Sequence, residues 1–307
     1  MVTLPSTLAR TASAPLISAG DAELAVSVQG AERAQTVVLA HGFGQTRHAW
    51  DTTAGALAQA GYRALSYDAR GHGDSSFNAA EVRYSPTQFT DDLIVVAGEH
   101  AEPPVLVAAS MGGLFGLLAE ARWPGLFRAI VLVDITPRWD TSGVERILRF
   151  MTAHPDGFAS LEAAADVIAH YLPHRPRKTA TQLRALLRQR DDGRWKWHWD
   201  PRLVEELAGQ NAQLQQHALL EAAAQVRCPV LLISGGRSDL VTPATISEFL
   251  SIVPHAQHVH LPEATHMLAG DDNTTFTATV LQYLDALPSV GTIAASNITE
   301  HVTGARP

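Results

Sequence analysis

Three residue types that together perform acyl transfer occur in this chain, each just after a run of residues typical of a β-strand. Ser110 lies in "VLVAASMGGLFG", between a β-branched run and a helix-like segment. Asp239 follows the apolar run of "LLISGGRSDLVTP", and His266 lies near the end of "HVHLPEATHM". A serine hydroxyl is a weak nucleophile, so it needs a base and an acid that orients the base. We therefore predict Ser110 as nucleophile, His266 as base and Asp239 as orienting acid.

The neighbours of Ser110 match the sharp turn that exposes a nucleophile, with one departure. The usual pattern is G-x-S-x-G. Gly112 fills its last position, but Ala108 stands at its first. Ser18 and Ser234 share the Ser-x-Gly spacing. Ser234 also ends an apolar run, but a loop-like segment follows it rather than a helix, so Ser110 is favoured. The alternative for Ser110 is a buried structural serine.

The acid and the base each have a competitor. Asp134 ends the apolar run "AIVLVD" and is the alternative acid; otherwise it is a hydrogen-bonded residue at the start of a loop. His258 and His260 alternate in "HVH". We interpret both as surface or packing histidines, because no pattern for a third metal ligand accompanies them.

The segment "VVLAHGFGQTRHAW" is the expected source of one oxyanion donor. An acyl-transfer intermediate needs hydrogen-bond donors for its developing negative charge. We predict the backbone N–H groups of Phe43 and Met111 as these donors. His41 is expected to hold the loop in place, and Gln45 either lines the pocket or is an ordinary loop residue.

Apolar β-branched runs alternate with helical patterns along most of the chain, which predicts a parallel sheet covered by helices on both faces. The predicted strands are 23–28, 36–40, 63–67, 104–109, 129–134, 229–234 and 257–261. The predicted helices are 47–60, 86–100, 111–122, 243–253 and 273–286.

The alternation breaks between about 137 and 225, where we expect a helical insertion over the sheet. Its segments "GVERILRFMTAH", "SLEAAADVIAHYL" and "TATQLRALLRQR" are each typical of a helix. Near its end, Trp195, Trp197 and Trp199 occupy every second position of "DGRWKWHWDPR" and share one face if the segment is extended. These side chains either form an aromatic wall of the substrate pocket or pack the insertion onto the core, and packing is favoured. Trp139 is another candidate pocket residue.

Composition narrows the functional classes. The chain has 307 residues, of which 46% are hydrophobic and 18% charged, and its formal net charge of -8 makes a broad nucleic-acid interface improbable. Its one cysteine, Cys228, excludes an internal disulfide and suits a reducing compartment. No apolar run reaches membrane-spanning length, and the N-terminal segment has no signal-peptide pattern. We expect a cytoplasmic protein with a loose tail over residues 289–307.

With these motifs in this order, the chain resembles the α/β-hydrolase family. The matching segments are "HGFG", "YDARGHGDS", "ASMGG", "GGRSDLVTP" and "ATHM". The resemblance implies an eight-stranded, mostly parallel sheet with a helical cap between the sixth and seventh strands. The core would span 20–136 plus 226–288, with the cap at 137–225. In such a fold Asp68, Arg70 and Asp74 are expected to tie loops together.

A serine nucleophile in this family implies acyl chemistry and disfavours epoxide hydrolase or dehalogenase activity, which needs a carboxylate nucleophile. We expect a carboxylesterase that acts on small to medium apolar esters through an acyl-enzyme, with no cofactor and no metal. Alternatives are a cofactor-free perhydrolase or haloperoxidase-like enzyme, a C–C bond or lactone hydrolase, and a hydrolase-fold receptor for a small ligand. The expected partner is a small-molecule ester, and a homodimer is left open.

Overall fold

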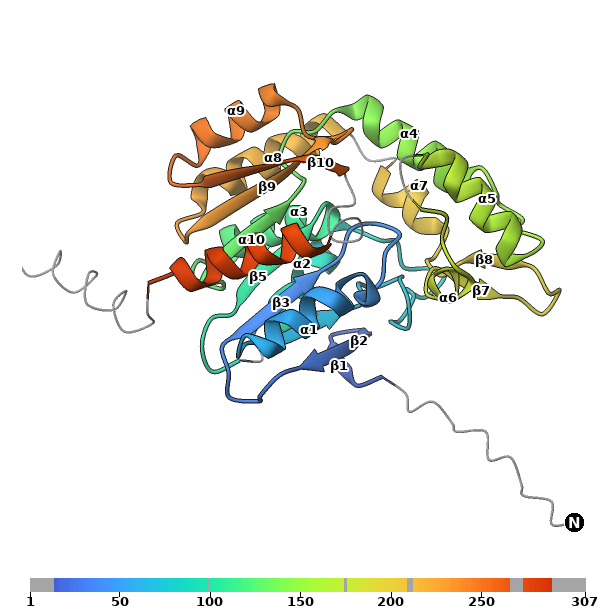
Figure 1. Ribbon diagram of the computed structural model, residues 1–307, viewed down its shortest axis with the longest axis horizontal. Helices are drawn as coiled ribbons and strands as arrows, with labels where there is room; N and C mark the ends of the chain where they lie inside the picture. The colour runs from blue at the N-terminus through green and yellow to red at the C-terminus, as the bar shows by residue number, and fades with distance from the viewer. Residues whose placement is uncertain (1–13, 99, 174–175, 209–211, 266–272, 289–307) are drawn as a thin grey trace, which may run out of the picture.

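The computed structural model describes residues 14–98, 100–173, 176–208, 212–265 and 273–288, and its central feature is an eight-stranded sheet (Figure 1). The strands lie in the order β1-β2-β4-β3-β5-β6-β9-β10. Their bounds are β1 Leu16–Ala19, β2 Ala22–Gln29, β3 Thr36–Ala40, β4 Arg63–Tyr67, β5 Val105–Ala109, β6 Ala129–Val133, β9 Val230–Arg237 and β10 Gln257–Thr265. All seven predicted strands are confirmed. β1 was missed because it has four residues and no apolar run of its own.

Six neighbouring strands run parallel, which decides where the functional side chains meet. β1 and β2 pair in antiparallel fashion, as do β2 and β4, whereas every pair from β4 through β10 is parallel. The carboxyl ends of β3, β5, β6 and β9 therefore lie along one edge of the sheet. Ligands of open α/β sheets bind at this edge.

Alternate residues of the central strands enter two separate hydrophobic clusters, one on each face. Val38 and Leu106 pack with α2 (Pro86–Gly98) and α3 (Met111–Arg122), while Val37 and Val107 pack with α1 (Asp51–Gln59) and α10 (Asn273–Ala286). The other helices outside the insertion are η1 Arg47–Trp50 and α9 Pro243–Ile252. Both faces of the sheet are thus covered, which explains why its strands are apolar on both sides.

The insertion between β6 and β9 forms a lobe beside the carboxyl edge of the sheet (Figure 1). Its elements are α4 Thr141–Thr152, α5 Leu161–Tyr171, α6 Ala180–Arg184, β7 Leu187–Gln189, β8 Trp195–Trp197, α7 Arg202–Ala208 and α8 Ala212–Gln225. The lobe has a small hydrophobic cluster of its own, which includes Phe158, Leu161 and Ile168. We refer to α4 through β8 as the cap.

Two expectations for the insertion need correction. The predicted helix over 179–190 is wrong beyond Arg184, because residues 187–189 form β7 and pair with β8 in an antiparallel hairpin. The Asp192–Gly193 dipeptide between the two strands is a known hairpin signal, and Gly193 has φ +79° there. The second correction concerns α8. It contacts α3, and Ala223 belongs to the main core cluster, so the end of the insertion packs as part of the core.

Candidate active site

Ser110 lies at a strained turn between β5 and α3. Its backbone has φ 47° and ψ −117°, a conformation that non-glycine residues seldom adopt. A Cβ at Gly112 would lie 2.8 Å from the Ala40 carbonyl oxygen, so α3 starts in direct contact with the end of β3. Ala108 is fully buried, and its methyl is accommodated in the core. The turn therefore has the geometry of a nucleophile elbow, and its strained conformation presents the serine side chain at the sheet edge.

The loop after β3 lies beside this serine. We call residues 42–44 the oxyanion loop, after the role predicted for the Phe43 N–H. A Cβ at Gly42 would lie 3.2 Å from Ser110 Cβ, which places the loop against this serine. Gln45 Oε1 accepts a hydrogen bond from the Gly42 N–H at 2.9 Å, so Gln45 both fixes the loop and lines the pocket. None of the described residues accepts a hydrogen bond from the Phe43 N–H. Met111 is the first residue of α3, where helical N–H groups lack partners within the helix.

Asp134 is buried next to the elbow, since the carbonyl of the preceding residue, Val133, accepts the Ser110 N–H. It follows β6, has φ 50°, and its side chain is fully inaccessible. Its carboxylate accepts hydrogen bonds from the Gly235 N–H at 2.8 Å and the Ser238 hydroxyl at 2.5 Å. A Cβ at Gly235 would lie 3.0 Å from the Thr265 carbonyl oxygen. Gly235 therefore lies between the Asp134 carboxylate and the backbone at the end of β10.

Asp239 has different surroundings. It lines the pocket, but its side chain is 44% exposed, and it forms an ion pair with Arg146 of α4 at 2.9 Å. A Cβ at Gly143, also on α4, would lie 2.2 Å from the Asp239 carbonyl oxygen. Asp239 thus faces the cap, whereas the Asp134 carboxylate contacts Gly235 of β9 and Ser238 just after that strand.

His266 lies outside the described residues, one position beyond the end of β10. Thr265, its neighbour, lines the same pocket as Ser110 and pairs with Arg237 at the end of β9. The other two histidines of this segment contact Ser234. The Ser234 hydroxyl lies 2.8 Å from His258 Nε2 and 3.2 Å from His260 Nδ1, in line with a packing role. Ser234 is thereby held between two rings away from the pocket.

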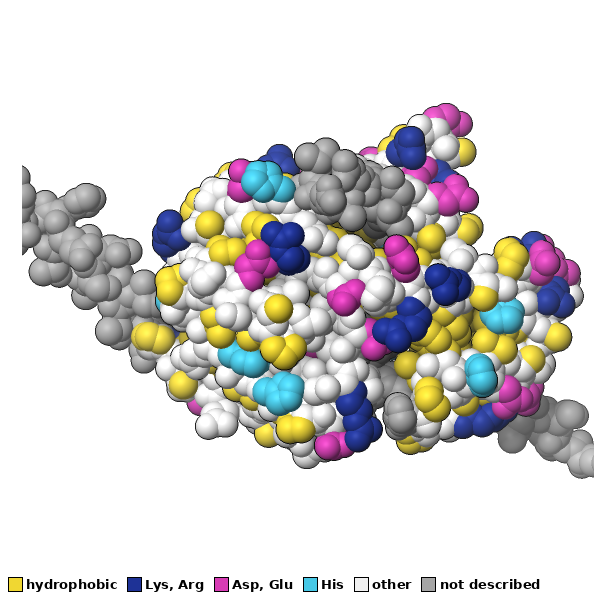
Figure 2. Space-filling model, turned by 90° about the horizontal axis from the view of Figure 1, so that it is seen from above, with side chains coloured by type: hydrophobic (Ala, Val, Ile, Leu, Met, Phe, Trp, Pro, Cys, Tyr) yellow, Lys and Arg dark blue, Asp and Glu magenta, His cyan; other side chains and the backbone are white. Residues whose placement is uncertain are grey.

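A cavity of about 380 Å³ lies between the oxyanion loop, Ser110 and the cap. On the face seen in Figure 2, hydrophobic side chains gather in a hollow beside the cap, with charged groups next to them. The cap contributes a mostly apolar wall: Ile147, Phe150, Met151, Ile168, Tyr171, Leu172, Leu186 and Trp197. Lys178 and Arg237 also line the cavity.

Residues 195–199 lead from the cap back to the core, and we call them the cap return. The three tryptophans of the cap return serve different purposes. Trp197 lines the cavity and also packs in the cap cluster. Trp195 packs in the cap cluster and Trp199 in the main core, 5.4 Å from the Phe43 ring. Trp139 packs against the main core, and the described lining of the cavity includes neither Trp139 nor Trp195.

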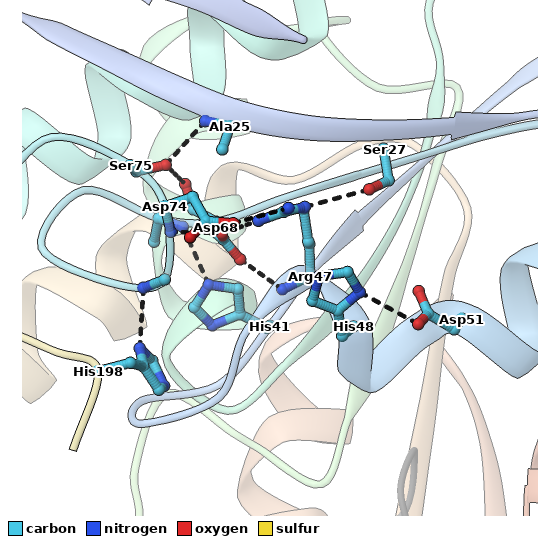
Figure 3. Close-up of polar contacts among 12 residues, drawn as sticks. Ala25, Ser27, His41, Arg47, His48, Asp51, Asp68, Asp74, Ser75 and His198 are labelled. Atoms are coloured by element: carbon cyan, nitrogen blue, oxygen red, sulfur yellow. Dashed lines mark hydrogen bonds and ion pairs between the residues drawn. The ribbon is translucent and has the colours of Figure 1, made fainter. Parts of the chain in front are cut away.

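The loop after β4 is tied to the core by buried ion pairs, as expected from its sequence (Figure 3). Asp68 binds the Arg47 side chain and accepts the Arg47 backbone N–H at 2.7 Å. Asp74 lies 2.9 Å from Arg47, and Arg70 pairs with Asp92 at 2.6 Å. The role of Arg47 was not predicted from the sequence, because an arginine one turn before a helix carries no pattern that reveals its burial.

Comparison with known proteins agrees with this architecture. Residues 31–273 match the family described as "Serine aminopeptidase, S33". The chain belongs to the α/β-hydrolase family. This α/β-hydrolase is 30% identical to Esterase Rv0045c of Mycobacterium tuberculosis, over 82% of the chain and 83% of that protein. It is 27% identical to the 3-hydroxybutyrate-oligomer hydrolase of Cupriavidus necator, over 76% of the chain and 82% of that protein.

Solved structures show the same fold. A crystal structure of the Mycobacterium tuberculosis esterase superposes with a TM-score of 0.68 at 28% identity, covering 89% of the chain and 90% of that structure. The structure of E-2-(acetamidomethylene)succinate hydrolase gives a TM-score of 0.77 at 22% identity, over 89% and 98% of the two chains. Hydrolase activity therefore follows from the family. No helix among the described residues is long and apolar enough to cross a membrane.

Proposed function

We propose that this α/β-hydrolase is a serine esterase that cleaves carboxylic esters through an acyl-enzyme. The observation that carries the proposal is the strained Ser110 at the edge of an apolar cavity, with the oxyanion loop against it. Ser110 Oγ attacks the ester carbonyl, and His266 takes the proton and returns it to the leaving alcohol. The Phe43 and Met111 N–H groups stabilise the oxyanion, and water then hydrolyses the acyl-enzyme. Similarity to two proteins named as an esterase and an oligomer hydrolase supports ester chemistry.

The acyl group is proposed to be apolar and of medium length. Cap side chains such as Phe150, Leu172 and Trp197 would surround it, and burial of each methylene group contributes about 0.8 kcal/mol of binding free energy. A cavity of about 380 Å³ lies within the size range of small-molecule sites. Charged acyl groups would lose hydration against this wall without regaining equivalent contacts.

The orienting acid has two candidates, Asp239 and Asp134, and the described contacts favour Asp134. An acid that orients an imidazole works best when it is buried and itself held by hydrogen bonds. Asp134 meets both conditions, and its carboxylate lies near the backbone from which His266 follows. Asp239 is more exposed and paired with a cap arginine.

Steady-state hydrolysis of p-nitrophenyl esters, from acetate to octanoate, tests the proposed esterase. We expect turnover that peaks at an intermediate chain length, because the cavity limits the acyl group. In the Ser110→Ala variant, kcat should fall by a factor of about 10⁴ or more while the protein stays folded. Hydrolysis that persists in this variant would show that Ser110 is not the nucleophile.

A pair of asparagine variants separates the two acids. Asn keeps the shape of Asp but favours the wrong imidazole tautomer, which costs about 10⁴-fold in kcat at a true triad acid. We expect this loss for Asp134→Asn and a loss below about 10-fold for Asp239→Asn, with ester kinetics as the measurement. The reverse ranking would return the acid role to Asp239.

A further inference from the structure

Three buried histidines surround the oxyanion loop, and each comes from a different segment. His41 directly follows β3, His72 lies in the loop after β4, and His198 follows β8, where the cap returns to the core. They are between 0 and 3% exposed. Ring centroids lie 5.1 Å apart for His41 and His72, and 5.9 Å apart for His72 and His198. Figure 3 shows His41 and His198 pointing toward the loop that carries Asp68 and Asp74.

Backbone groups fix the tautomer of every ring. The accepted bonds are Ala69 N–H to His41 Nε2 at 2.9 Å, Gly44 N–H to His72 Nε2 at 3.2 Å and Gly73 N–H to His198 Nδ1 at 2.8 Å. A ring nitrogen that accepts cannot carry a proton, so in the neutral ring the other nitrogen donates. These donors reach the carbonyls of Gly42 at 2.8 Å, Arg70 at 3.1 Å and Gly44 at 3.2 Å, in the same order of histidines.

The environment keeps these rings neutral. Burial lowers the pKa of His41 and holds the pKa of His72 well below the ordinary histidine range. Burial also lowers the pKa of His198, to about 4. At neutral pH each ring therefore offers one acceptor and one donor, which is what its two backbone partners require.

Three of the six bonds end on the oxyanion loop. The Gly42 carbonyl, bound by His41, belongs to the same peptide plane as the Phe43 N–H, so this bond orients the proposed oxyanion donor. Gly44 is held on both sides, because His72 accepts its N–H and His198 donates to its carbonyl. Its φ of +73° is a conformation that glycine adopts without steric cost.

We propose that His198 is a positioning residue for the oxyanion hole, linking the cap return to the oxyanion loop. Its Nδ1 is anchored on the Gly73 N–H, and its Nε2–H holds the Gly44 carbonyl. A shift of the cap return would therefore move the loop that carries Phe43. The inference rests on the proposed esterase function, because the hole matters only if an oxyanion forms.

Two substitutions at this position each keep one of the two bonds. In His198→Gln, the side-chain amide can take the place of Nε2–H and still donate to Gly44, but the Gly73 contact is lost. In His198→Asn, the shorter side chain can accept from Gly73 at the place of Nδ1, but it no longer reaches Gly44. Each variant loses one hydrogen bond to the backbone, so their stabilities should be similar, whereas only the asparagine releases the oxyanion loop.

The measurement is kcat and KM for p-nitrophenyl butyrate, together with inhibition by butylboronic acid. A boronate adds to Ser110 Oγ as a tetrahedral anion that mimics the oxyanion. For His198→Asn we expect kcat to fall about 10-fold with KM within about 2-fold, since the loss falls on transition-state stabilisation. The boronate should bind weaker by a similar factor. His198→Gln should keep kcat within about 3-fold of the wild type.

Controls distinguish a failure of this inference from a failure of the proposed esterase function. His217→Asn, at an exposed side chain on α8, should leave all parameters unchanged, and urea unfolding should give similar stabilities for the two His198 variants. Equal kcat for His198→Gln and His198→Asn in an active enzyme would overturn the inference about His198 but not the esterase proposal. A wild-type protein that neither hydrolyses the ester nor binds the boronate would overturn the esterase proposal and this inference with it.

If His198→Asn does not fold, His72 supplies the same contrast. His72→Gln can accept the Gly44 N–H at the place of Nε2, whereas His72→Asn cannot reach it. We expect the glutamine variant to retain higher kcat and boronate affinity. Equal values in this pair would also overturn a histidine-held oxyanion loop.

Discussion

At the scale of single residues, the elbow depends on close backbone contact rather than on one residue type. Ala108 replaces the usual glycine and is buried without displacing β5. Gly112 has no such room, because a Cβ there would lie 2.8 Å from the Ala40 carbonyl oxygen and 2.9 Å from Ala40 Cβ. The two positions that flank Ser110 in the motif are therefore not equivalent.

We predict that Gly112→Ala destabilises the protein by about 1–3 kcal/mol, because β3 and α3 must separate to admit the methyl. Ester turnover should fall as well, since the start of α3 carries the Met111 N–H. The matched control is Gly55→Ala in α1, where a Cβ would meet only Gln29 Oε1 at 3.6 Å. That variant should be more stable than the wild type by about 0.5–1 kcal/mol. Urea unfolding measures the free energy of unfolding of both variants. An unchanged value for Gly112→Ala would contradict the close contact between α3 and β3.

At the scale of elements, the β7–β8 hairpin supplies a wall of the cavity. Trp197 stands between the cap and the core: its ring lies 5.5 Å from that of Phe158 and 6.4 Å from that of Trp199. Arg188 of β7 also reaches Asp74 of the core at 2.7 Å. The hairpin therefore both shapes the cavity and attaches the cap to the core.

We predict that Trp197→Ala moves the preferred ester toward longer acyl chains, because removal of the indole enlarges the cavity. The variant should also lose about 3–5 kcal/mol of unfolding free energy. The control is Trp123→Ala, since Trp123 is 62% exposed at the end of α3 and outside the described cavity lining. The measurement is turnover along the p-nitrophenyl ester series. An unchanged chain-length optimum would show that Trp197 does not limit the length of the acyl chain.

At the scale of the whole molecule, the buried histidines join core, loop and cap and couple their stability to pH. The folded pKa of His198 is lowered from 6.5 to about 4. Between these values the unfolded chain binds more protons than the folded one, so stability falls as pH falls. His41, Asp68 and Arg188 act on His198 electrostatically, but burial is the largest cause of its shift.

We predict that the stability difference between the wild type and His198→Asn narrows as pH falls from about 6.5 toward 4. The variant lacks this proton uptake, so only the wild type loses stability through His198, by at most about 1.4 kcal/mol per pH unit. Urea unfolding at pH 7.5, 6 and 5 measures the difference. A difference independent of pH would mean that His198 is protonated equally in both states.

Seven of the eight strands of the sheet and the turn at Ser110 could be predicted from local sequence patterns. β-branched runs mark strands buried on both faces, and the small residues around Ser110 mark the close approach of β5 and α3. These signals are local in the chain, so they can be recognised without the fold. β7 was missed because three residues have too little periodicity, although Asp192–Gly193 carried a hairpin signal.

How distant segments of the chain meet could not be predicted from such local patterns. The tertiary structure placed Asp134 and Asp239 in different surroundings, because their partners, such as Gly235 for Asp134 and Arg146 for Asp239, are distant in the chain. It showed Arg47 inside the core, and it brought His198 to a loop 154 positions earlier in the chain. Such contacts leave no local pattern, because the partner that satisfies each polar group is chosen by the packing of the sheet and the cap.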